Sequence, residues 1–133
     1  EAKINYVSLR DVEFKQCDFT SVNFAMTDQV IYSFHFTDCT LDYTQFYKLK
    51  LKQIRFIGCS MVATDFMETD LTEAIFDHCD LRRAVFSKTI ANKADFSTSF
   101  NFTIDPEQNK LKKAKFALEG LKGLLEKYDL IIK

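Results

Sequence analysis

A large apolar residue recurs at every fifth position through most of this chain. From Ile31 to Phe96 the spacing is unbroken, and Ala91 is the only small residue in the series. A period of five fits neither the α-helix, with its period of 3.6, nor the β-strand, with its period of 2. The chain is therefore a repeat, in which each short unit buries its apolar residue against neighbouring units. The series comprises Ile31, Phe36, Leu41, Phe46, Leu51, Phe56, Met61, Phe66, Leu71, Phe76, Leu81, Phe86, Ala91 and Phe96.

Each unit has a second inward position, two residues before the large residue, which we call the central residue. This second position holds an apolar or hydroxyl residue such as Cys39, Thr44 or Ala74, and the residue between the two is usually polar. Such alternation is typical of a short strand. The last two residues of each unit must then turn the chain, because otherwise the next central residue would not face the same core.

The N-terminal stretch has the same unit in a shifted register. Its central residues include Phe14, Phe19 and Phe24, and the step from Phe24 to Ile31 is two residues longer than the repeat requires. We therefore predict a bulge or small outward loop at positions 26–30. Loops on rigid scaffolds often carry binding, so these positions are candidate partner-binding residues, with a neutral insertion as the alternative: Met26, Thr27, Asp28, Gln29 and Val30.

The cysteines indicate how many units make one coil. Cys17, Cys39, Cys59 and Cys79 all occupy the second inward position, at separations of 22, 20 and 20 residues. Twenty residues are four units, so the sequence predicts an all-β solenoid with four sides, parallel ladders and about five coils. Stacked thiols that point the same way favour free, buried cysteines, which is typical of a reducing, cytoplasmic compartment.

The repeat units resemble those of the pentapeptide-repeat proteins. The resemblance covers roughly residues 2–100 and implies a right-handed quadrilateral β-helix over residues 1–100, followed by a closing segment over 101–133. That closing segment is similar to the bacterial quinolone-resistance (Qnr-like) subset, in which a short helical cap and an extended tail end the coil. The units that carry the resemblance include Ala74-Ile75-Phe76, Cys79-Asp80-Leu81, Ala84-Val85-Phe86 and Ala94-Asp95-Phe96.

The C-terminal residues predict one last repeat and a helical cap. Asp105-Pro106-Glu107-Gln108 has the residues of a helix start, and Ala114–Phe116 returns to the repeat. An amphipathic α-helix over about 117–128 then covers the open end of the coil. Its apolar face is also a candidate for pairing two protomers, and the resemblance implies that both roles occur together. This face consists of Leu118, Leu121, Leu124, Leu125 and Tyr128.

Composition and register exclude several classes of protein. Residues 1–106 hold 11 Lys/Arg and 15 Asp/Glu, whereas residues 107–133 hold 7 Lys and 4 acids, so neither part is a nucleic-acid footprint. No apolar run is long enough to span a membrane.

His35 and His78 are outward while the cysteines are inward, so we predict no metal site. We find no catalytic motif and predict no cofactor. Five acids lie at the outward position between the two inward residues, where we expect them either to contact backbone groups at the corners or to be solvated: Asp18, Asp65, Asp70, Asp80 and Asp95.

Exposed apolar residues then suggest a protein-binding role. Tyr47 and Met67 share one outward column and are candidate partner-binding residues. Four more apolar residues are predicted to face outward, namely Ile57, Val62, Ile75 and Val85.

The resemblance implies a type II topoisomerase such as DNA gyrase as partner. In that family, an elongated acidic rod imitates duplex DNA and modulates quinolone sensitivity. At a formal charge of −4 over residues 1–106, a loop-mediated contact fits better than simple mimicry. The alternative is a structural or adaptor module with an unrelated partner. An acidic column on one flank would favour the topoisomerase, and a neutral flank with Tyr47 and Met67 exposed would favour the adaptor.

Overall fold

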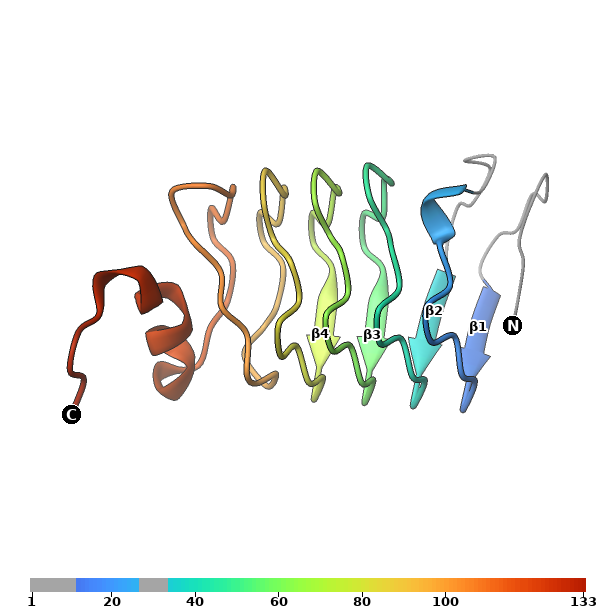
Figure 1. Cartoon of the computed structure of the whole chain (residues 1–133), viewed down its shortest axis with the longest axis horizontal. Helices are drawn as coiled ribbons and strands as arrows, with labels where there is room; N and C mark the ends of the chain where they lie inside the picture. The colour runs from blue at the N-terminus through green and yellow to red at the C-terminus, as the bar shows by residue number, and fades with distance from the viewer. Residues whose placement is uncertain (1–11, 27–33) are drawn as a thin grey trace.

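Successive coils of the chain stack side by side as parallel rungs (Figure 1). The computed structural model describes residues 12–26 and 34–133. The strand β1 (Val12–Lys15) lies at one end of the rod and the C-terminal cap lies at the other (Figure 1). Of the bulge predicted at positions 26–30, only Met26 is described, as the last residue of the 3-10 helix η1 (Phe24–Met26). Positions 27–30 lie outside the described residues.

One side of the coil is a regular parallel sheet. Its strands β1, β2 (Phe34–Thr37), β3 (Arg55–Ile57) and β4 (Ile75–Asp77) follow each other in sequence order. Phe14 pairs with Phe36, Phe36 with Phe56, and Phe56 with Phe76. The offset of 22 residues at the first step and 20 at the next two is the offset predicted from the cysteines.

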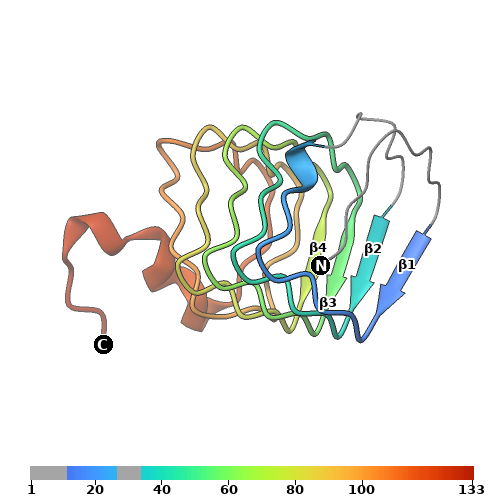
Figure 2. The same cartoon turned by 45° about the vertical axis from the view of Figure 1, so that its right-hand side comes forward.

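The other three sides are held by isolated parallel bridges, so the coil has four faces (Figure 2). We define each face by the residues that point outward between its two inward residues. Face A is the sheet. Face A has Glu13, His35, Arg55, Ile75, Asp95 and Lys115; face B has Asp18, Thr40, Ser60, Asp80 and Phe100; face C has Asn23, Gln45, Asp65 and Val85; face D has Lys50, Asp70, Ile90 and Lys110.

The core consists of two phenylalanine columns separated by two mainly aliphatic ones. On face A, the rings of Phe56 and Phe76 are stacked with centroids 5.1 Å apart. On face C, Phe46 and Phe66 are stacked at 5.4 Å. Rings from the two columns meet edge to face, as for Phe56 and Phe66 at 6.0 Å. The repeat of twenty residues places each phenylalanine ring on a phenylalanine ring of the next coil. Both geometries are favourable for aromatic pairs.

The turns between the faces have a common backbone conformation. The second residue after the central residue has a positive φ in nearly every described unit, and Gly58 is the only glycine among them. The acids predicted to contact the backbone do so, because each accepts a hydrogen bond from the N–H two residues later, as Asp65 does from Met67 at 2.8 Å. The same bond is made by Asp18, Asp70, Asp80 and Asp95.

The chain leaves the regular coil after Phe96 and returns to it for one more repeat. Phe100 continues face B by pairing with Asp80, and Phe102 and Ile104 are buried. The turn at Asp105–Gln108 forms no helix. Phe116 then stacks on Phe96 at 5.3 Å, so a last repeat after an excursion is what the structure contains.

The cap differs from the predicted α-helix. It consists of two 3-10 helices, η2 (Leu118–Leu124) and η3 (Glu126–Tyr128). Their turns close by bonds over three residues, such as Gly120 N–H to the Ala117 carbonyl at 3.0 Å. The physical reason is contact with Phe102, described below.

The prediction that Val62 faces outward is also wrong. Val62 is buried, because the Asp42 carboxylate binds both Val62 N–H and Ser60 Oγ beside it.

Candidate partner-binding surfaces

Face C presents the two apolar residues that the sequence singled out. Tyr47 and Met67 follow Phe46 and Phe66, which are stacked one coil apart, so the two side chains are neighbours in one column. Tyr47 is exposed and Met67 is partly exposed. The Lys48 N–H donates to the Met67 carbonyl at 3.1 Å, which fixes the backbone of both positions. The Tyr47 hydroxyl lies 3.4 Å from Glu68 Oε2, and the Lys48 ammonium lies over the Tyr47 ring.

Further exposed side chains extend this surface. Val85 is 41% exposed and pairs with Asp65 in the next coil of face C. At the corner between faces B and C, the Arg83 guanidinium donates to the Tyr43 hydroxyl at 3.0 Å. This bond spans two coils and crosses the position of Ala63. Sequence reasoning missed the pair, although its separation of 40 residues, twice the coil length, was the signal that could have found it.

The outward columns carry no continuous acidic stripe among the described residues. Face B holds two aspartates in five positions, face C one in four, and face D places Asp70 between Lys50 and Ile90. Several of these carboxylates also have an oxygen engaged in the corner bonds. Surface charge therefore alternates with neutral and basic residues, and the flank that exposes Tyr47 and Met67 is close to neutral.

The histidines and cysteines do not converge. His78 is exposed and its Nδ1 lies 2.5 Å from Asp77 Oδ1, which also accepts a bond from Thr98. These contacts, led by that to His78, lower the pKa of Asp77. Within the described residues, no group of three potential ligands could hold a metal ion.

The four cysteines are free and lie in the core column. Cys39, Cys59 and Cys79 are buried, and Cys17 is partly exposed. Each of the buried thiols lies close to a carbonyl of the preceding coil, as Cys79 Sγ does to the Phe56 oxygen at 3.3 Å. Burial raises the pKa of the Cys39 thiol, so this thiol is a poor nucleophile and serves as core filler.

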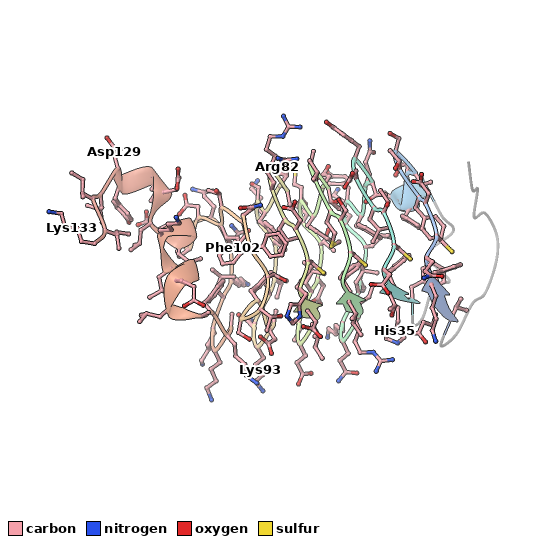
Figure 3. The ribbon with its side chains drawn as sticks, turned by 90° about the horizontal axis from the view of Figure 1, so that it is seen from below. His35, Arg82, Lys93, Phe102, Asp129 and Lys133 are labelled. Atoms are coloured by element: carbon pink, nitrogen blue, oxygen red, sulfur yellow. The ribbon has the colours of Figure 1, made fainter. Side chains whose placement is uncertain are left out.

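The cap offers a second apolar surface. In a 3-10 helix, residues three apart lie on one side, so Gly120 and Gly123 form one row while Leu118, Leu121 and Leu124 form the next. The glycine row faces the coil: a Cβ at Gly123 would collide with the Phe102 carbonyl oxygen, and one at Gly120 would lie 3.0 Å from the Phe102 ring. Figure 3 shows Phe102 in the last turns of the coil, beside the cap.

The predicted apolar face of the cap is therefore largely outside the core. Leu118 is 82% exposed, Leu121 and Tyr128 are exposed, Leu125 is partly buried, and Leu124 packs against the core. The tail beyond η3 adds three more exposed apolar residues, Leu130, Ile131 and Ile132. The cap packs on the coil through its glycines and Leu124, which leaves Leu118 and Leu121 exposed.

An ionic cluster ties the cap to the loop before the last repeat. The Lys127 ammonium pairs with Glu107 and lies 3.1 Å from Asp105 Oδ1. These contacts, led by that to Glu107, raise the pKa of Lys127 to about 12. The pKa of Asp105 is lowered by the Glu107 N–H and by Lys127. None of the helices in the described residues has the length and apolar character needed to cross a lipid bilayer.

A four-sided parallel solenoid with exposed side chains on rigid ladders is a scaffold for binding at its surface. A family described as a pentapeptide repeat region matches residues 29–116. The chain belongs to this family, and its right-handed quadrilateral β-helix, predicted from the resemblance, is confirmed.

Two solved structures share the fold. A trypsin-treated QnrB1, described as a plasmid-mediated fluoroquinolone resistance protein, superposes with a TM-score of 0.74 at 14% identity. That match covers 91% of this chain and 58% of the QnrB1 chain, so the chain spans a little over half of that protein. HetL from Nostoc sp. strain PCC 7120, described as involved in heterocyst differentiation regulation, has a TM-score of 0.61 at 16% identity, over 72% of this chain and 38% of its own. No curated protein matches the sequence.

Proposed function

We propose that this chain is a non-enzymatic protein-binding module that presents face C to its partner. The observation that carries the proposal is the column of Tyr47 and Met67, with Val85 in the next coil, on a backbone fixed by ladder bonds. Rigid aromatic and apolar side chains bind with little loss of conformational entropy. The predicted loop at Met26, Thr27, Asp28, Gln29 and Val30 precedes this column and belongs to the proposed contact.

The proposed partner is a type II topoisomerase such as DNA gyrase, whose sensitivity to quinolones the module would change. The likeness to a fluoroquinolone resistance protein supports this choice. The mixed charge of the outward columns favours contact through side chains over imitation of duplex DNA. The same mixed charge also favours the second candidate, an adaptor that binds an unrelated protein through face C.

A supercoiling assay separates the two candidates. Gyrase is assayed with and without ciprofloxacin while the protein is added. The topoisomerase proposal expects protection or inhibition, lost in the double variant Tyr47→Ala/Met67→Ala. The matched control is Ile57→Ala/Ile75→Ala, which truncates two outward residues of face A and is expected to act like the wild type. Absence of any effect of the wild-type protein would contradict the topoisomerase proposal and favour the adaptor.

We further propose that the cap pairs two copies of the chain. The exposed leucine row of η2 and the apolar tail support this, because contiguous exposed apolar residues are typical of interfaces. Sedimentation velocity tests it: the wild type is expected to sediment as a dimer and Leu118→Glu/Leu121→Glu as a monomer. Ile57→Glu/Ile75→Glu adds the same charge on face A and is expected to remain dimeric. A wild type that is monomeric at all concentrations would contradict the proposal.

A further inference from the structure

The last repeat carries lysine at every outward position. In residues 110–116 the inward side chains are Leu111, Ala114 and Phe116, and the four that remain are lysines. Two lysines of the preceding coil, Lys88 and Lys93, lie alongside. We call this set the lysine surface: Lys88, Lys93, Lys110, Lys112, Lys113 and Lys115, all exposed.

The backbone holds these lysines in fixed places at the C-terminal end of face D, on its two corners and, for Lys115, on face A. The Ala91 N–H donates to the Lys110 carbonyl at 2.8 Å, and the Lys93 N–H donates to the Lys112 carbonyl at 2.9 Å. The Lys112 N–H in turn donates to Asn92 Oδ1 at 2.9 Å. Lys93 and Arg82 project from opposite sides of the rod (Figure 3). The backbone positions of the six lysines are therefore held by a rigid ladder.

The neighbouring acids are already engaged. Asp105 and Glu107 pair with Lys127 of the cap. Asp95, which pairs with Lys115 along the ladder, accepts bonds from the N–H and hydroxyl of Ser97. Glu73 accepts a bond from Gln53 at 3.3 Å. Within the part of the chain that the structure describes, none of the six lysines forms a salt bridge.

The lysine surface contains two open depressions. One, of about 390 Å³, lies between Glu73, Asn92, Lys93, Lys112 and Lys113. The other, of about 330 Å³, is bordered by Lys88, Lys110 and Glu107, whose carboxylate pairs with Lys127. Both are of a size to receive short acidic side chains between ammonium groups.

We infer that the lysine surface binds a carboxylate-rich segment of a partner protein. Nucleic acid fits less well, because residues 1–106 hold 15 acids against 11 basic residues and would repel a polyanion lying along the rod. Exposed aromatics on which bases stack belong to other parts of the described chain, such as Tyr47 on face C and Phe100 on face B. A lipid surface also fits less well, since Ile90, which faces outward among the lysines, is only partly exposed and the other apolar residues between them face inward. This surface meets face C at the corner that holds Lys88, and the inference does not depend on the topoisomerase proposal.

The experiment measures binding of a fluorescein-labelled oligoglutamate peptide to the whole chain by anisotropy, at low and at high salt. The peptide is expected to bind and to dissociate as salt rises. The charge reversal Lys110→Glu/Lys112→Glu/Lys113→Glu is expected to weaken binding at least about tenfold, as is the milder triple change to Gln. The matched control is Lys48→Glu/Lys50→Glu/Lys52→Glu, in which two positions belong to the same columns of face D at its other end. It changes the net charge equally and is expected to stay within about twofold of the wild type.

Three results would overturn the inference. They are no binding of the peptide at low salt, equal weakening in the control triple, and tighter binding of duplex DNA or phosphatidylserine vesicles than of the peptide. Urea unfolding of the variants confirms that they are folded before binding is compared, and the glutamine triple provides the test if the glutamate triple is unstable.

Discussion

At the scale of the residue, the corners of the coil carry a conformational cost that the ladder outweighs. The left-handed backbone costs an L-residue roughly 1–2 kcal/mol, yet the corner residues include Gln16, Tyr43, Lys48 and Ala63. The cost is tolerated because the corner N–H groups bond to the next coil, as Ala63 does to the Arg82 carbonyl at 2.9 Å. The corners of the coil thus accept residues that do not favour the left-handed conformation.

The first prediction follows from that cost. Ala63→Gly should stabilise the protein by about 0.5–1 kcal/mol, because relief of the left-handed strain exceeds the entropy that glycine adds to the unfolded chain. Ala94→Gly, at a buried inward position with no positive φ, should destabilise by about 1 kcal/mol. Urea unfolding measures both. The same sign for the two substitutions would contradict the account of the corners.

At the scale of the element, the cap is shaped by its contact with Phe102. Apolar spacing over 117–128 predicts an α-helix, but Gly120 and Gly123 need to lie three apart on one side to approach the Phe102 ring and carbonyl. The Ile104 N–H also donates to the Gly123 carbonyl at 3.0 Å. A 3-10 helix satisfies these contacts, and Leu118 and Leu121 then turn away from the core while Leu124 packs against it.

The second prediction tests this close approach. Gly123→Ala should destabilise the docked cap by about 1–3 kcal/mol, because its methyl group would collide with the Phe102 carbonyl and force a shift of η2. Hydrogen exchange should become faster in η2 and remain unchanged in β3. Lys122→Ala, at the exposed neighbouring residue, provides the control and should leave exchange as in the wild type. Slow exchange of η2 in the glycine variant would show that the approach is not required.

The third prediction concerns the ionic cluster that anchors the cap. The pKa of Asp105 is lowered in the folded chain, so its contribution is present above the unfolded value and is lost as the pH falls through the folded one. The pKa of Lys127 is raised to about 12, so its contribution is lost only at strongly alkaline pH. Cap docking should therefore weaken on acidification below about pH 4. Amide chemical shifts of residues 118–128 measure it. Asp105→Asn should reduce the acid response, and an unchanged response would contradict the role of Asp105.

At the scale of the whole molecule, most of the architecture could be predicted, because inward residues of the same kind stack on one another in successive coils. The spacing of the central residues predicts the four faces, the 22-residue first step and the return of Phe116, because each central residue must stack on its counterpart in the next coil. The helix type of the cap and the burial of Val62 were not predictable. Both depend on neighbours brought close only by folding, namely Phe102 for the cap and Asp42 for Val62.

The candidate surfaces also include some features that the register predicts and others that depend on contacts made only in the folded chain. The column of Tyr47 and Met67 could be predicted, since it follows from register alone. The Tyr43–Arg83 bond was missed because it spans two coils. The pairing of Lys127 with Asp105 and Glu107, which engages two acids beside the lysine surface, depends on where the cap docks. A repeat thus reveals which side chains share a face, while the irregular end that closes the rod decides which charges remain available.

The last prediction tests the stacking of columns directly. Deletion of Thr64–Glu68 removes one unit and rotates every later face by a quarter turn, so phenylalanine columns meet aliphatic ones where the two parts join. The stacks that cross the deletion, Phe46–Phe66 at 5.4 Å and Phe56–Phe76 at 5.1 Å, are lost. Deletion of residues 64–83 removes a full coil and rejoins Ala63 to Ala84, which occupies the same inward position of face C as Thr64. Thermal melting by circular dichroism compares the two. Because rigid stacks cannot adjust to mismatched columns, the shorter deletion should melt at the lower temperature, although it removes fewer residues. If the chain lacking five residues melted at or above the chain lacking twenty, stacking of like columns would not be what stabilises the rod.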